Sequence, residues 1–154
     1  MKRLLISILA VMMVFTLAAG GVCSAQTEEA AVRVEEAGEE FLAQKDAFEE
    51  FIDDDTEYQI KVVFSANVVV KDFKYFETTI TEVDKDGKEV FDVIKELYSA
   101  DELSPERPLV IRMSFPGSMP SRGISYVDEN GTTRYFAVCM SGEDGSIFLY
   151  EFSK

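Results

Sequence analysis

The 154-residue sequence has no histidine and no tryptophan, and its only cysteines are Cys23 and Cys139. Without histidine, a serine or cysteine nucleophile has no imidazole base, and zinc sites built on histidine are excluded. No Ser-x-x-Lys motif follows residue 25, and no glycine-rich phosphate loop follows a predicted strand. Paired carboxylates could act as acid and base, but 29 acidic residues produce such pairs by chance. The sequence therefore identifies no catalytic residue, no cofactor-binding residue and no cofactor.

Basic side chains are also few, with 15 Lys and Arg against 29 Asp and Glu, which gives a net charge of −14. Such a chain is repelled by nucleic acid and by anionic membrane surfaces. We therefore expect neither of them as a partner.

Only one hydrophobic run is long, and it lies at the N-terminus. Lys2 and Arg3 precede the apolar run 4–19, and Cys23-Ser24-Ala25 supplies small residues before Gln26. This order predicts a secretory signal peptide over residues 1–25, cleaved after Ala25, and a secreted or periplasmic protein. Two alternatives are an uncleaved anchor, since the run approaches the roughly 20 residues that span a bilayer, and a lipid on Cys23. After cleavage no integral membrane domain is expected, and the net charge becomes −16 because Lys2 and Arg3 are lost.

Cleavage would leave Cys139 without a partner for an internal disulfide. It lies in the apolar stretch 135–140, where a thiol behaves as a small hydrophobic group. We expect a structural role for Cys139.

Residues 26–57 hold most of the excess negative charge, with 13 acidic and 2 basic side chains. Apolar residues recur there at intervals of three, four or seven: Val34, Ala37, Phe41, Phe48 and Ile52. This spacing predicts an amphipathic helix over 28–52 that ends at Asp53-Asp54-Asp55. We interpret residues 26–57 as an acidic helical arm or linker and residues 58–154 as a β-domain able to fold without it.

From Tyr58 onward the apolar period is two, as in a strand with one buried face. It is clear over 58–64 and 109–115, and residues 73–83 are rich in strand-forming side chains. Residues 90–98 fit a strand or a helix, and 99–102 read as a loop with local helical structure. Three turns, 84–87, 128–131 and 142–145, end in glycine and predict hairpins closed by a type I turn and a left-handed glycine. The last two would make 123–153 a three-stranded meander with a central middle strand.

These signals predict a mainly β fold. We expect an antiparallel β-sandwich of about seven strands, with an immunoglobulin-like arrangement as one form of it and a small β-barrel as the alternative.

The first acidic turn partly resembles the start of a calcium loop, through Glu82, Asp84, Asp86 and Gly87. The closing bidentate acid would fall at Val93, so the coordination shell would stay incomplete. We therefore predict a hairpin turn and no metal ligand.

The loop 116–123 is the candidate contact surface, because its two prolines restrict the backbone. Met119 and Arg122 would project from it, and both residue types are enriched at interfaces. We expect an exported non-enzymatic binding or interaction module of the bacterial envelope or exterior, whose partner is a protein or an envelope component. The alternatives are a small secreted hydrolase that uses paired carboxylates and a carbohydrate-binding module.

Overall fold

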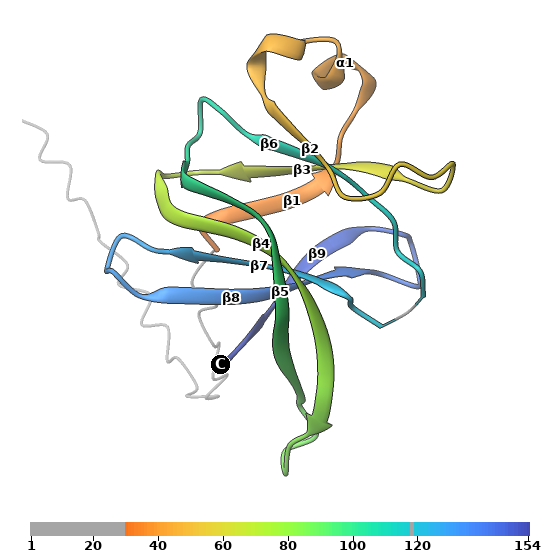
Figure 1. Cartoon of the computed structure of the whole chain (residues 1–154), viewed down its shortest axis with the longest axis vertical. Coiled ribbons are helices and arrows are strands. Elements are labelled where there is room, and N and C mark those ends of the chain that lie inside the picture. Colours follow the sequence, from red (N-terminus) through yellow and green to blue (C-terminus); the bar gives the residue numbers. More distant parts are fainter. Residues whose placement is uncertain (1–29, 118) are drawn as a thin grey trace, which may run out of the picture.

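The computed structural model describes residues 30–117 and 119–154, which form two β-sheets that share a core (Figure 1). The four-stranded sheet has the order β1-β3-β6-β2, and the five-stranded sheet has the order β5-β4-β7-β8-β9. The strands are β1 Val32–Glu36, β2 Glu49–Ile52, β3 Ile60–Ala66, β4 Val70–Val83, β5 Glu89–Leu103, β6 Leu109–Met113, β7 Arg122–Val127, β8 Thr133–Met140 and β9 Ile147–Phe152. The mainly β prediction is confirmed, whereas the barrel is wrong because the two sheets do not close into one.

The predicted signal peptide, its cleavage site and Cys23 lie outside the described residues. Among residues 30–117 and 119–154, no helix is long or apolar enough to cross a membrane.

The predicted helix over 28–52 is wrong. Its described part contains strands β1 and β2, joined by a single helical turn α1 (Glu39–Leu42) and a short 3-10 turn (Lys45–Ala47). Strand β1 pairs with β3, and β2 pairs in parallel with β6. Phe41 and Phe48 stack at 5.2 Å between ring centroids, so their helix-like spacing comes from a turn that brings two rings together. This segment is part of the four-stranded sheet and not a helical arm.

Strands β4 and β5 form one long hairpin that projects beyond the rest of the molecule (Figure 1). Residues 90–98 are therefore strand, and the loop expected over 99–102 is wrong, because these residues pair with the start of β4. Asp84 closes the turn, since its N–H donates to the Lys88 carbonyl and its carbonyl accepts from the Gly87 N–H. Gly87 has φ = 80°, as predicted for a left-handed glycine.

The predicted meander is confirmed, with β7 paired to β8 and β8 paired to β9. Gly131 and Gly145 have φ values of 78° and 73°. The last turn is one residue longer than predicted, because the Gly145 N–H donates to the Ser141 carbonyl.

Strand β8 is covered on both faces, as expected of a central strand. Phe136 and Val138 belong to the main core between the sheets. Ala137 belongs to a second, smaller core on the outer face of the five-stranded sheet, formed by Phe76, Phe91, Ala137 and Phe152. The second core exists because the distal part of the β4–β5 hairpin bends over this face, so Phe91 of one edge strand reaches Phe152 of the other at 4.9 Å between ring centroids.

Candidate functional site

Arg122, one of the two predicted contact residues, is turned toward the protein. It is the first residue of β7, and its Nε donates to Asp53 Oδ2 at 2.6 Å. The Tyr75 hydroxyl donates to the same oxygen at 2.8 Å. Met119 is 65% exposed. Arg122 thus binds within the protein, whereas Met119 is exposed to solvent, so the two residues do not form one surface. A contact of either residue with a partner stays a prediction.

Burial dominates the electrostatics of this Asp53–Tyr75–Arg122 cluster. It raises the pKa of Tyr75 far above its usual value, and the Asp53 carboxylate raises it further. Burial opposes the charge on Arg122, but the hydrogen bond to Asp53 and the nearby negative charges still raise its pKa. Tyr75 stays neutral and Arg122 stays charged, so the cluster ties the end of β2 to β4 and β7 through hydrogen bonds to Asp53.

A similar cluster joins β2 to β5. The Tyr98 hydroxyl donates to Glu49 Oε1 at 2.7 Å, and Arg107 lies 3.4 Å from the other carboxylate oxygen. Burial and the Glu49 carboxylate raise the pKa of Tyr98. Both carboxylates of these clusters are held by a tyrosine and an arginine, and Glu49, Tyr98 and Arg107 also line a pocket of about 120 Å³.

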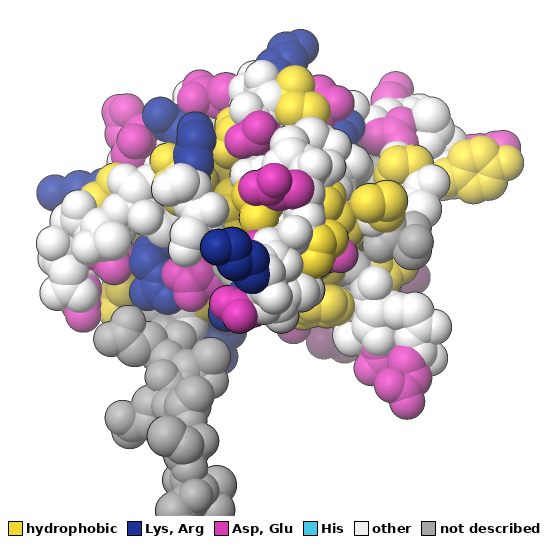
Figure 2. All heavy atoms as spheres, turned by 90° about the horizontal axis from the view of Figure 1, so that it is seen from below, with side chains coloured by type: hydrophobic (Ala, Val, Ile, Leu, Met, Phe, Trp, Pro, Cys, Tyr) yellow, Lys and Arg dark blue, Asp and Glu magenta, His cyan; other side chains and the backbone are white. Residues whose placement is uncertain are grey.

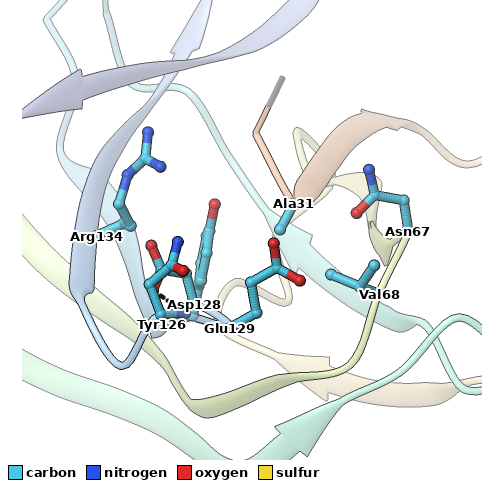
Figure 3. A pocket seen from close by; sticks show the side chains of 8 residues that line it. Ala31, Asn67, Val68, Tyr126, Asp128, Glu129 and Arg134 are labelled. Carbon is cyan, nitrogen blue, oxygen red and sulfur yellow. Dashed lines mark hydrogen bonds between the residues drawn. The ribbon is translucent and has the colours of Figure 1, made fainter. Parts of the chain in front are cut away.

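A pocket of about 290 Å³ lies at one end of the sheets, beside the start of β1 (Figure 3). The Tyr126 side chain extends into this pocket, with Arg134 on one side and Glu129 and Val68 on the other. The Tyr126 hydroxyl is buried, and the N–H groups of Ala31 and Val32 lie close to it without reaching hydrogen-bond geometry. Burial raises the pKa of Tyr126, while Arg134 and the amides of Ala31 and Val32 lower it. The Arg134 guanidinium also holds Glu151, through Nε and through Nη2 at 2.8 Å.

A second hollow lies on the outer face of the five-stranded sheet, between the β4–β5 turn and the end of β9. We call it the outer-face groove; it encloses about 360 Å³ and is lined by Asp84, Lys88, Glu89, Val90, Tyr150, Glu151, Phe152 and Ser153. Figure 2 views the molecule from below Figure 1, the side toward which the β4–β5 turn points, and shows hydrophobic side chains interspersed with acidic and basic ones.

Strand pairing explains how the covered part of this face is packed. One row of neighbours crosses four strands: Phe76, Gly123, Ala137 and Tyr150. The two middle residues are the smallest, and the Phe76 ring fills the space over Gly123, within 2.4 Å of where a Cβ would be. The next row ends in Phe148, paired with Cys139. Phe148 and Tyr150 are 44% and 37% exposed.

Cys139 is partly buried and packs against the second core. Burial is the main cause that raises its pKa to about 11, and the Glu89 carboxylate adds to it. Phe91 of β5 and Ala137 of β8 share the second core, which brings the start of β5 close to β8.

The acidic turns form no metal centre among residues 30–117 and 119–154, where no three Asp, Glu, Cys or His side chains are placed to hold an ion. In the first turn, Asp84 Oδ1 accepts the N–H groups of Asp86 and Lys88. Asp128 Oδ1 does the same for Asn130 and Thr132. These carboxylates close hairpins, which is the backbone use of aspartate in tight turns.

Sequence reasoning missed the outer-face groove. One signal was present: Phe148, Tyr150 and Phe152 alternate through the last strand and mark an aromatic face. The bend of the β4–β5 hairpin over that face left no pattern in the sequence.

Comparison with known proteins gives no family. No protein-family model, no curated protein and no solved structure matches this chain.

Proposed function

We propose that this chain is an exported, non-enzymatic protein that serves as a binding or interaction module of the bacterial envelope or exterior. The observation that carries the proposal is the outer-face groove, which Tyr150 lines, together with Phe148 two residues earlier on the same strand; both side chains are partly exposed. Aromatic side chains are costly to leave in water, and contiguous exposed apolar surface is typical of interaction sites. Export rests on the three-part N-terminus of the sequence.

The finer form of the fold that we propose is an immunoglobulin-like sandwich. Without β2 and β9, the sheet orders are β1-β3-β6 and β5-β4-β7-β8. These correspond to the A-B-E and C′-C-F-G strands of that fold. Strand β2 takes the place of strand D but runs parallel to its neighbour β6, and β9 is an added edge. Sandwich domains host many functions, so the fold alone does not select a partner.

A carbohydrate-binding module is the second candidate, because sugar rings stack on exposed aromatic side chains and Phe148 and Tyr150 are two such side chains on one face. Against it, the chain has no tryptophan. A hydrolase with paired carboxylates has less support, since Asp53 and Glu49 are each bound by a tyrosine and an arginine.

Site-specific photocrosslinking in cells that export the chain tests the proposal. A photoreactive phenylalanine analogue at position 148 should give a covalent adduct with a partner, and the same analogue at Tyr58, which is 77% exposed, should not. Adducts at position 119 alone would move the site to the loop predicted from the sequence. No adduct at either 148 or 119 would contradict a binding function at both surfaces. The intact mass of the exported chain in the same samples should match that of a chain that begins at Gln26.

A further inference from the structure

We propose that Asn130, in the turn between β7 and β8, is an acceptor site for N-linked glycosylation. The inference rests on the export that is part of the proposed function, because oligosaccharide is transferred to asparagine outside the cytoplasm. It is independent of the outer-face groove.

The sequence of this turn carries the acceptor motif. Asn130-Gly131-Thr132 has the form Asn-x-Ser/Thr, with a residue other than proline in the middle. The other asparagine of the chain, Asn67, is not followed two positions later by serine or threonine. Asp128 lies two residues before Asn130, which is the position at which bacterial oligosaccharyltransferases require an acidic side chain.

The structure places the motif where a transferase can reach it. The turn lies at an outer end of the five-stranded sheet (Figure 1), and Asn130 and Thr132 are both exposed. The side chains of these two residues make no hydrogen bond to any of residues 30–117 and 119–154. Asn130 also lines the pocket beside β1, so there is space next to its amide for the first sugar.

The turn itself does not use these two side chains. Asp128 Oδ1 accepts the backbone N–H groups of Asn130 and Thr132, and Gly131 supplies the positive φ of 78°. An Asn-Gly pair is common in turns for backbone reasons. That use requires neither an exposed, unbonded amide nor a hydroxyl two residues later, whereas glycosylation requires both.

The transfer forms one bond and breaks one. Asn130 Nδ2 attacks C1 of the first sugar of a lipid-linked oligosaccharide diphosphate, and the bond between C1 and the phosphate oxygen breaks. The lipid diphosphate leaves with the electron pair, and Nδ2 gives one proton to a base of the transferase. The step needs no oxidant or reductant.

Peptide mapping of the chain purified from its native cells tests the proposal. Trypsin cleaves after Arg122 and Arg134, so residues 123–134 form one peptide whose only asparagine is Asn130. This peptide should appear in a heavier form beside the free form, and fragmentation should release sugar ions and place the added mass on Asn130. The intact protein should likewise show a heavier species beside the chain that begins at Gln26.

Matched variants separate the motif from the turn. Asn130→Gln should abolish the heavier peptide without lowering the midpoint of thermal unfolding, because the Asn130 side chain makes no hydrogen bond to the described residues and its φ is not positive. Thr132→Val should abolish the heavier peptide although Asn130 is still present, whereas Thr132→Ser should retain it. Asn67→Gln, at the other exposed asparagine, should leave the modification unchanged.

The proposal is overturned if the peptide 123–134 of the exported chain is found only unmodified, or if its heavier form survives Thr132→Val. It is also overturned if the only change is hydrolysis of the Asn130 amide to aspartate, which is spontaneous deamidation at an Asn-Gly pair. An exported chain without sugar would reject glycosylation alone, and a chain that retains residues 1–25 would reject export together with it.

Discussion

Gly123 is the residue at which the outer face is most tightly constrained. A Cβ there would lie 2.4 Å from a Phe76 ring carbon and 2.7 Å from the Phe136 carbonyl oxygen. The ring could move, but the carbonyl belongs to the β7–β8 ladder. Gly123→Ala should therefore lower the free energy of unfolding by about 1–3 kcal/mol, the usual range for overpacking.

Denaturant unfolding measures this effect. Gly117→Ala is the control, because a Cβ at Gly117 meets no atom within 4 Å. Equal stability of the two variants would show that the Phe76 ring does not rest on Gly123.

Cys139 gives a prediction with a defined pH dependence. Its pKa of about 11 in the folded protein lies above the unfolded value of about 8.5. The fold favours the neutral thiol, so this contribution to stability is complete below about pH 8.5 and is lost as the pH rises toward 11. Cys139→Ala should cost about 1 kcal/mol at pH 7, and the difference from the natural chain should shrink between pH 8.5 and 11.

Labelling with a thiol reagent at pH 8 provides a second measurement. Native Cys139 should react much more slowly than the unfolded chain, because little thiolate is present. Rapid labelling of the native protein would contradict burial of this thiol.

At the scale of elements, the acidic segment 30–57 is the least expected part of the fold. It supplies both edge strands of the four-stranded sheet and the Asp53 carboxylate that binds Tyr75 and Arg122. From the sequence alone, the β-domain after it is expected to fold independently. The structure predicts the opposite, because loss of β1 exposes the pairing edge of β3 and uncovers part of the main core around Phe64.

A chain that begins at residue 58 should therefore lack a cooperative thermal transition. Circular dichroism and calorimetry measure it, with a chain that begins at residue 30 as the control. A sharp transition in the shorter chain would show that β1 and β2 are accessory to the core.

The elements that could be predicted are those with local signals. Period-two alternation in 58–64 and 109–115 identified β3 and β6, and the turns ending in Gly87, Gly131 and Gly145 identified the hairpins. These signals depend on neighbours a few residues apart. Strand β2 could not be recognised, because its partner β6 begins about 60 residues later and pairs with it in parallel. The groove could not be recognised for the same reason, since Phe91 and Phe152 meet only when the long hairpin bends.

At the scale of the whole molecule, negative charge is the dominant property. The chain carries −14, and −16 if residues 1–25 are removed. Ion pairs on the surface oppose this repulsion, for example Glu50 with Arg112 and Lys61, which lower the pKa of the carboxyl. Each exposed pair contributes only about 0–1 kcal/mol, and the pairs are themselves screened by salt.

Added salt weakens the repulsion between the acidic side chains, which raises stability, and it weakens the ion pairs, which lowers stability. The sign of the change in the unfolding midpoint therefore shows which of the two contributions is larger. Raising the NaCl concentration from about 10 mM to 0.1 M shortens the screening length from roughly 30 Å to 10 Å. This change in screening length weakens repulsion between distant charges of the molecule but leaves ion pairs at 3–4 Å largely unchanged. We expect the midpoint of thermal unfolding to rise by about 3 °C, as for a gain of somewhat less than 1 kcal/mol in a domain of this size. Calorimetry at both salt concentrations measures it, with an equal osmolality of glycerol as the control. A midpoint that fell with salt would mean that the ion pairs outweigh the excess charge.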